Sequence, residues 1–217
     1  KTRVITTKIA YLINQKNVTP HSILAVTFTK KAAKEMMDRA VKLEPRAQSS
    51  MIRTFHSFGS WFLRKYYEHA GIAKNFTVYD DDDMITLVSK AIPELNKAQA
   101  SSVAHHISLA KDYCYLPDSP HLSDITNDLD FPRYYKLYQQ RLRQTGNVDF
   151  GDLIMLPVLL LEQNEQIRFQ MHYRFKVILV DEYQDSNVAQ FRLLKVMTSY
   201  FDSSTKKDNL NQTYVCV

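Results

Sequence analysis

The stretch VILVDEYQD, residues 177–185, joins an apolar strand to two adjacent carboxylates, and the fold prediction starts from it. Its apolar part, KVILV (176–180), has no polar face, which is typical of a strand covered by helices on both sides. Two other runs of this type, SILAVTFT (22–29) and the shorter MIRTF (51–55), precede it along the chain. Helical sequence separates these runs, and the alternation predicts an α/β fold with a parallel sheet flanked by helices.

The helical patterns divide the chain into two parts. Between the strands, apolar side chains recur at helical spacing, as in residues 3–16 and 30–43. From about Thr77 to Gly146 the sequence is mostly helical, apart from a stretch rich in Pro, Ser and Asp that reads as an exposed loop. We therefore expect an α/β domain made of residues 1–76 and 147–217. A helical subdomain, 77–146, would be inserted into it, with its two ends returning to the same sheet.

The composition excludes several classes of protein. With 45% hydrophobic and 24% charged residues, the chain is neither disordered nor fibrous. No apolar run approaches the ~20 residues of a bilayer span and no secretory leader opens the chain, so we expect a cytoplasmic protein without a membrane partner. Cys114 and Cys216 lack metal-ligand spacing and are expected to be reduced thiols. The final TYVCV reads as a strand in which the chain ends, a pattern that indicates a fragment.

Charge and glycine are unevenly used. Residues 1–74 hold 14 of the 28 Lys and Arg but only 4 of the 23 Asp and Glu. A basic first third suits a polyanionic partner, although an excess of solvated lysines is the more common cause of such a balance. Only four glycines are present, which excludes a complete glycine-rich phosphate loop.

The two carboxylates of the opening stretch carry the strongest chemical signal. Asp181 and Glu182 stand at the carboxyl end of an apolar strand, where ligands bind in open α/β sheets. Successive side chains diverge there, so one carboxylate can hold Mg²⁺ through its water shell while the other faces a nucleophilic water. That division of labour suits nucleotide hydrolysis. Two solvated acids at a strand end would be the competing interpretation, and the following Tyr183, Gln184 and Asp185 argue against it.

A second, weaker signal is the pair Lys1 and Thr2, which stands directly before a helix. A phosphate loop ends in Gly-Lys-Ser/Thr at a helix N-terminus, where the lysine neutralises phosphate oxygens and the hydroxyl binds Mg²⁺. Only the last two letters of that motif are present here, so the pair has little weight by itself.

A third signal is the chemistry that follows the first two strands. Aromatic rings there could stack on bases, and hydroxyls could contact phosphates. Taken singly, each ring is better explained as a core aromatic, but the coincidence of the rings with the basic first third favours a surface for single-stranded nucleic acid. The residues concerned are Thr27, Phe28, Thr29 and Lys30 after the first strand, and Thr54, Phe55 and His56 after the second.

In this order, the motifs resemble the first motor domain of the UvrD/PcrA/Rep family of superfamily 1 DNA helicases, and the resemblance covers essentially the whole chain. Lys1-Thr2 resembles the end of the family's Walker A loop, and TYVCV the strand leading into motif III. The remaining matches are AVTFTKKAAKEM (25–36) to motif Ia, RTFHSF (53–58) to motif Ib, NVDFGDLI (147–154) to the signature after the insertion, and VDEYQD (180–185) to motif II.

The resemblance implies a P-loop NTPase of RecA-like fold that uses ATP and Mg²⁺ to translocate along single-stranded DNA and separate duplex strands, in repair or replication. It implies that Lys1 contacts the β/γ phosphates, that Thr2 and Asp181 hold Mg²⁺, and that Glu182 activates the attacking water. Arg3 would lie near the base or ribose. The DNA path would be lined by Thr27, Phe28, Thr29, Lys30, Thr54, Phe55 and His56. The insertion would approach the duplex junction, with Arg133, Lys136, Arg141 and Arg143 as phosphate contacts.

The resemblance also implies a partner, the second motor domain of the same protein. The family's adenine motif and loop glycines would precede Lys1, and its motif III and further arginines would follow Val217. We therefore expect the chain by itself neither to hydrolyse ATP at a useful rate nor to unwind DNA. Two alternatives stay open: a nucleic-acid-binding module with a silent nucleotide site, and the related helicase-nuclease subunit of a recombination complex.

Overall fold

The computed structural model describes residues 2–198, 200–202, 207–209 and 213–216, with side chains as far as Thr198. The chain forms two compact units. Unit 1 comprises Lys1–Phe58, Leu161–Ser186 and Phe191–Val217, and unit 2 comprises Gly59–Leu160 and Asn187–Gln190. The predicted insertion, 77–146, lies wholly within unit 2.

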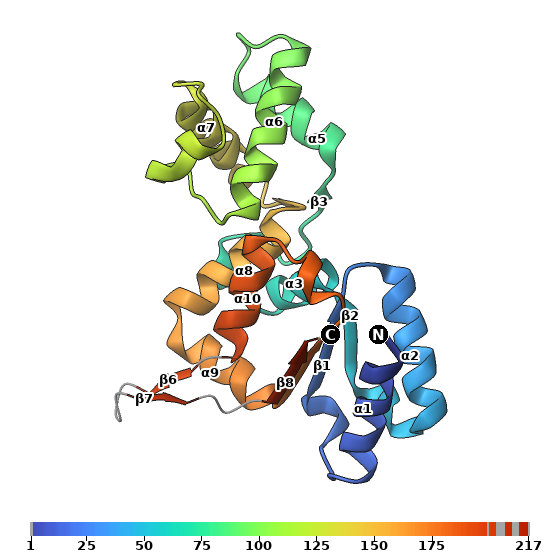
Figure 1. Ribbon diagram of the computed structural model, residues 1–217. Helices are drawn as coiled ribbons and strands as arrows, with labels where there is room; N and C mark the ends of the chain where they lie inside the picture. Colours follow the sequence, from blue (N-terminus) through green and yellow to red (C-terminus); the bar gives the residue numbers. More distant parts are fainter. Residues whose placement is uncertain (1, 199, 203–206, 210–212, 217) are drawn as a thin grey trace. The chain divides into compact units, whose positions relative to one another are not determined.

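The described residues alternate between helices and strands (Figure 1). The α-helices are α1 (Thr2–Asn14), α2 (Lys30–Leu43), α3 (Phe55–Lys65), α4 (Tyr67–Ala70), α5 (Asp81–Ala91), α6 (Lys97–Asp112), α7 (Phe131–Gln144), α8 (Asp152–Gln163), α9 (Glu165–Arg174) and α10 (Val188–Thr198). The strands are β1 (Ile23–Thr27), β2 (Met51–Thr54), β3 (Val78–Tyr79), β4 (Val148–Asp149), β5 (Val177–Val180), β6 (Tyr200–Asp202), β7 (Lys207–Asn209) and β8 (Thr213–Cys216). Short 3₁₀ turns are η1 (Pro20–Ser22), η2 (Pro45–Ser49), η3 (Pro120–Asp124) and η4 (Tyr183–Asp185).

Unit 1 is built on a four-stranded parallel sheet in the order β2-β1-β5-β8. Every residue of β1 and β5 is buried, as the continuous apolar runs predicted. Figure 1 shows α1 and α2 on one side of this sheet and α9 with the end of α10 on the other. Because all four strands run the same way, their carboxyl ends meet at one edge, and the α/β prediction is confirmed.

The core of unit 1 lies between the sheet and the first two helices. Ile5, Ile9 and Ile13 of α1 lie on one helical face and are at most 1% exposed, packed with Ala25 of β1 and Leu179 of β5. The apolar side chains that recur at helical spacing in residues 3–16 thus form the buried face of α1. Their packing against the sheet positions the N-terminus of the helix.

Unit 2 has a separate helical core. It gathers apolar side chains of α5, α6 and α7, including Tyr135 and Tyr138, which are fully buried. The two ends of the predicted insertion pair directly as the short parallel strands β3 and β4, with Val78 opposite Val148. Asp80 caps α5 by accepting from the Asp83 amide at 2.9 Å, and the Asp83 side chain accepts from the Asp80 amide in return.

Pro157 lies inside α8, and apolar side chains on either side of it are buried in the core. One detail differs from the sequence-based expectation. The stretch 115–130, expected to be an exposed loop, contains η3, and Leu122 within it is only 3% exposed because it packs into the core of unit 2. Cys114 is a free, buried thiol, whereas the side chain of Cys216 lies outside the described residues.

A buried ionic cluster joins the helices of unit 2. The Lys111 ammonium of α6, 1% exposed, contacts the carboxylates of Asp149 at 2.5 Å and Asp152 at 2.8 Å. Arg143 of α7 donates to Asp152 at 2.9 Å, and the Tyr138 hydroxyl donates to Asp149 at 2.8 Å. Two cations thus balance two anions where α6, α7 and α8 meet.

Among the described residues, no helix combines the length and apolar character needed to cross a membrane.

Candidate functional site

The carboxyl edge of the sheet in unit 1 brings together residues that lie far apart in the sequence. Asp181 directly follows β5, and its amide donates to the carbonyl of Val26 in β1 at 3.0 Å. The hydroxyl of Thr2, at the start of α1, donates to Oδ2 of Asp181 at 3.3 Å. These two residues are 179 positions apart in sequence, and both were predicted to hold the same ion.

The environment of the Asp181 carboxylate favours binding of a cation. It is 2% exposed, and its Oδ1 atom has no hydrogen-bond partner within the described part of the chain. A buried carboxylate oxygen without a partner is costly, and a metal ion offsets that cost. Carboxylate and hydroxyl oxygens are hard ligands of the kind that Mg²⁺ takes. The residues present therefore fit this ion.

The protein supplies only part of such a coordination sphere. Within the described ranges, no group of three or more His, Cys, Asp and Glu side chains could hold a metal ion. Mg²⁺ sites in nucleotide-binding proteins commonly use one or two protein ligands, with waters and phosphate oxygens completing the shell. A site of this composition suits Mg²⁺ carried with a nucleotide rather than a permanently held structural ion.

The N-terminus of α1 adds favourable conditions for an anion. The helix spans 13 residues, and no acidic side chain stands in its first turn. Unpaired amides and the helix dipole favour a phosphate at such a terminus. Thr6 supports this first turn, because its hydroxyl donates to the carbonyl oxygen of Arg3 at 3.1 Å. The Arg3 side chain is exposed, and Lys1 lies outside the described residues.

Glu182 stands in an unusual backbone conformation. Its φ of 52° and ψ of 43° are left-handed, a region that costs an L-residue about 1–2 kcal/mol. The chain turns here from β5 into η4, so the Glu182 side chain departs from the alternation of the strand. The side-chain amide nitrogen Nε2 of Gln184 donates to Oε2 of Glu182 and orients it. Backbone strain of this kind clusters at functional sites.

The second predicted group, after β1, combines a buried and an exposed layer. Thr27 is 2% exposed, whereas the half-buried Phe28 ring packs on the ring of Phe55 with 5.4 Å between centroids. The hydroxyl of Thr29 accepts from the Ala32 amide at 3.0 Å and caps α2. Lys30 occupies the first position of that helix and is exposed.

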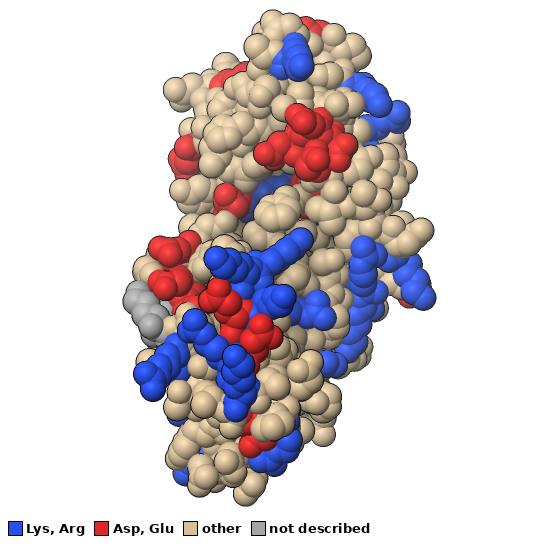
Figure 2. Space-filling model, turned by 90° about the vertical axis from the view of Figure 1, so that its right-hand side faces the viewer, with Lys and Arg blue, Asp and Glu red and all other residues tan. Residues whose placement is uncertain are grey.

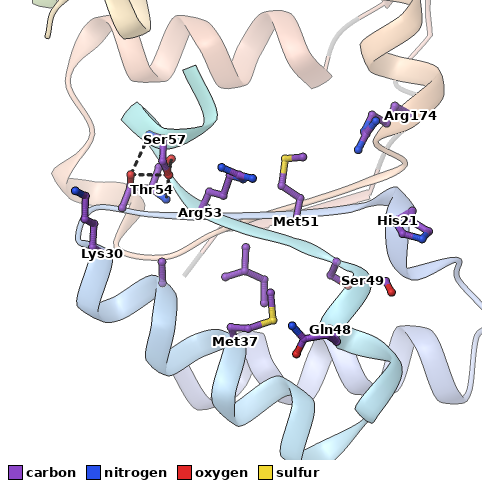
Figure 3. Close-up of a pocket in the computed structure, with 13 residues that line it drawn as sticks. His21, Lys30, Met37, Gln48, Ser49, Met51, Arg53, Thr54, Ser57 and Arg174 are labelled. Atoms are coloured by element: carbon purple, nitrogen blue, oxygen red, sulfur yellow. Dashed lines mark hydrogen bonds between the residues drawn. The ribbon is translucent and has the colours of Figure 1, made fainter. Parts of the chain in front are cut away.

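The third group, after β2, is organised by a strand-to-helix turn (Figure 3). The amide of Thr54 donates to the Ser57 hydroxyl at 3.0 Å, and the amide of Ser57 donates to the Thr54 hydroxyl at 3.1 Å. Phe55, 1% exposed, lies beneath Phe28. His56 is half-buried, and burial lowers its pKa from 6.5 to about 4, so its imidazole is neutral at pH 7.

The structure therefore brings the predicted DNA contacts that follow β1 and β2 to one edge of the sheet, in two layers. Thr29 and Lys30 are exposed, with Phe28 and His56 partly so, while Thr27, Thr54 and Phe55 are buried among them. Sequence reasoning missed the parts played by Ser57 and Gln184. A Thr and a Ser three residues apart at a strand-helix junction is a capping pattern, and that spacing could have identified the first.

The candidate phosphate contacts of the insertion are mostly engaged within the protein. Arg143 donates to Asp152 and to the carbonyl oxygen of Asn147. Arg133 pairs with Glu94 at 3.0 Å, and Arg141 donates to Gln144 at 3.1 Å. Lys136 is exposed.

Comparisons with known proteins show which family this chain resembles. A family model described as the UvrD/REP helicase N-terminal domain matches residues 1–204. The chain is 38% identical to the ATP-dependent DNA helicase Rep of Escherichia coli over 91% of its own length and 30% of that protein. It is 37% identical to a probable DNA helicase II homologue of Mycoplasma capricolum, over 98% of this chain and 31% of that protein. It is 35% identical to the ATP-dependent DNA helicase PcrA of Bacillus subtilis, over 94% of this chain and 28% of that protein. The chain thus spans less than a third of each of these relatives.

Proposed function

The chain belongs to the UvrD/REP helicase family, and on that premise we propose that it is the N-terminal motor part of an ATP-dependent DNA helicase. Such a protein would use ATP and Mg²⁺ to move along single-stranded DNA and separate a duplex, in the cytoplasm, during repair or replication. The observation that carries the proposal is the contact between the hydroxyl of Thr2 and the buried carboxylate of Asp181, with the second oxygen of Asp181 left without a partner.

Each residue has a proposed role at this edge. Thr2 and Asp181 would hold Mg²⁺, which neutralises phosphate charge when it is bound. Lys1 would contact the β/γ phosphates, and Arg3 the base or ribose. Glu182, turned off the strand by its left-handed backbone, would orient and deprotonate the attacking water.

We assign the DNA contacts to the neighbouring strand ends. Lys30 and the hydroxyl of Thr29 would contact phosphates, and Phe28, supported by Phe55, would stack on a base. His56 would act as a neutral hydrogen-bonding group. Thr27 and Thr54, which are buried, would contribute by fixing the turns that follow β1 and β2. The insertion, 77–146, would approach the duplex junction, and a second motor domain would complete both the nucleotide site and the DNA path.

The test is ATP turnover with and without single-stranded DNA, in a chimaera where this chain replaces the matching segment of the E. coli Rep helicase. DNA-stimulated turnover is expected, and Glu182→Gln should lower it by at least about 100-fold while ATP still binds. Absence of turnover in the folded chimaera, with DNA binding retained, would favour the silent binding module instead. The chain alone should bind both ligands with negligible turnover, because phosphoryl transfer relies on further cations around the γ-phosphate.

A further inference from the structure

A groove runs along the outer edge of β2, beyond the predicted DNA contacts. β2 is an edge strand, because the sheet order places β1 on one side of it and no described strand on the other. The groove has a volume of about 430 Å³ and lies entirely within unit 1. Its walls come from α2, η1, η2, the start of α3 and the end of α9, with β2 along its length (Figure 3).

The lining is cationic. Lys30, Arg53, Arg174 and His21 contribute to it, and none of its lining residues is Asp or Glu. Lys30 and Arg53 take part in none of the ion pairs among the described residues, while the guanidinium of Arg174 lies 5.3 Å from the ring centroid of Phe175. Figure 2 shows Lys and Arg gathered at several places on the face that it draws, in part beside Asp and Glu. The lining of this groove contributes cations and no acids.

The cations are spread along a line rather than gathered at one point. Lys30 stands at one end beside Thr54 and Ser57, Arg53 lies between, and His21 and Arg174 stand at the other end (Figure 3). β2 itself, from Met51 to Thr54, spans about 10 Å at the rise of an extended strand. A single phosphate would use one or two of these groups. An extended polyanion would use all of them.

The groove also offers neutral contacts between its charges. Gln48 and Ser49 are exposed at its far end, where an amide and a hydroxyl can donate to phosphate oxygens. Met51 and Met37 give it apolar patches against which a sugar or a base can pack. Alternating cationic, polar and apolar groups are the chemistry that binds a single strand without reading its sequence.

We propose that the edge of β2 is an additional single-stranded DNA subsite, in which Arg53 and Arg174 bind the phosphates of the strand after it leaves the strand-end contacts at Lys30. The proposal rests on the proposed function, because Lys30 and Thr54 belong to both surfaces and make them continuous. The occupant is the sugar-phosphate backbone of the same DNA strand. An acidic extended peptide adding to the β2 edge is the competing occupant, and the experiment separates the two.

The test measures binding of oligothymidylates of about 4, 8 and 16 nucleotides to the 217-residue chain by fluorescence anisotropy over a range of salt concentrations. Affinity should rise with length. Arg53→Gln and Arg174→Gln should each weaken the 16-mer by about tenfold at low salt and lower its salt slope by about one, leaving the 4-mer unchanged. Arg39→Gln, on α2 outside the groove, makes the same charge change and should alter both oligonucleotides equally and slightly.

The outcomes separate the two proposals. Binding of the 4-mer that depends on Lys30, with no gain from length and no effect of Arg53→Gln, would overturn the groove and leave the proposed function standing. Failure of every oligonucleotide to bind would also overturn the groove, whereas the proposed function is decided separately by the DNA-stimulated ATP turnover of the chimaera. Displacement of the 16-mer by a poly-glutamate peptide that binds more tightly would assign the groove to a peptide. Should a variant fold poorly, crosslinks from a photoreactive thymidine at each position of the 16-mer give an independent readout, and they should reach residues 48–53.

Discussion

At the residue scale, the Oδ1 atom of Asp181, which has no hydrogen-bond partner, favours ion binding but lowers the unfolding free energy of the protein without an ion. A buried charged oxygen without a partner costs about 1–3 kcal/mol, whereas the favourable field of the α1 N-terminus returns about 0.3–1 kcal/mol. The first effect is larger, and Asp181→Asn removes the charge while one buried polar atom of the new amide still lacks a partner, so the unfolding free energy should rise by up to about 1 kcal/mol. The same change should abolish the stabilisation that Mg²⁺-ATP gives. Thermal unfolding of both proteins, with and without Mg²⁺-ATP, measures the two effects, and a destabilised variant would contradict the assignment of an unsatisfied carboxylate.

His56 makes a second residue-scale prediction, on acid stability. Its pKa is about 4 in the folded chain and about 6.5 when unfolded, so between these values the unfolded state binds the extra proton. Protonation of His56 therefore costs no unfolding free energy above pH 6.5. As the pH falls from 6.5 toward 4, it lowers the unfolding free energy by about 2–3 kcal/mol. Urea unfolding at pH 7 and 4.5 should show a smaller acid loss for His56→Gln than for the wild type. His121→Gln, at an exposed histidine, should keep the wild-type difference.

At the element scale, the buried ionic cluster of unit 2 depends on Lys111. Lys111→Met leaves Asp149 and Asp152 with only Arg143 as a cation, and breaking a buried pair in this way costs about 3–5 kcal/mol. Burial already raises the pKa of Asp149, while Lys111 and Arg143 hold the pKa of Asp152 below its usual value against the effect of burial.

The pH dependence of that variant distinguishes a lost charge partner from lost packing. Without Lys111, the Asp149 carboxyl binds a proton in the folded state that the unfolded state lacks above about pH 4, so stability rises as the pH falls. The deficit against the wild type should therefore shrink between pH 7 and 5 in urea unfolding. A deficit that is the same at both pH values would show that packing dominates. Lys136→Met, on the exposed side of α7, should change stability by less than about 0.5 kcal/mol.

The elements that sequence predicted well are those with a strong period. The apolar runs at 22–29, 51–55 and 176–180 became β1, β2 and β5, and the helix expected at 30–43 has those bounds in α2. Lys111 was missed, although it occupies a core position of α6 beside Ile107 and Ala110, because a lysine in an apolar pattern reveals its partner only in three dimensions. The register that brings Thr2 to Asp181 could not be read from spacing, since 179 residues separate them.

At the scale of the whole molecule, the two units have separate cores. Whether they unfold independently can be tested by measuring which unit Mg²⁺-ATP stabilises. The core of unit 1 gathers α1, α2 and the sheet, and that of unit 2 gathers α5, α6 and α7. A ligand stabilises only the part whose folded state binds it, by about 2.7 kcal/mol at 100 times its dissociation constant. All the proposed nucleotide contacts belong to unit 1.

We therefore expect Mg²⁺-ATP to slow hydrogen exchange unevenly along the chain. The best-protected amides of β1 and β5 should exchange up to about 100-fold more slowly, because they open only when unit 1 unfolds. Amides of α6 and α7 should keep their rates, because unit 2 can open around its own core while unit 1 stays closed. Mass spectrometry of deuterated peptides separates these segments, with the Asp181→Asn variant as the control in which neither responds. Equal slowing in both units would mean that the chain unfolds as one cooperative body, and the nucleotide would then stabilise the helical insertion as strongly as the sheet.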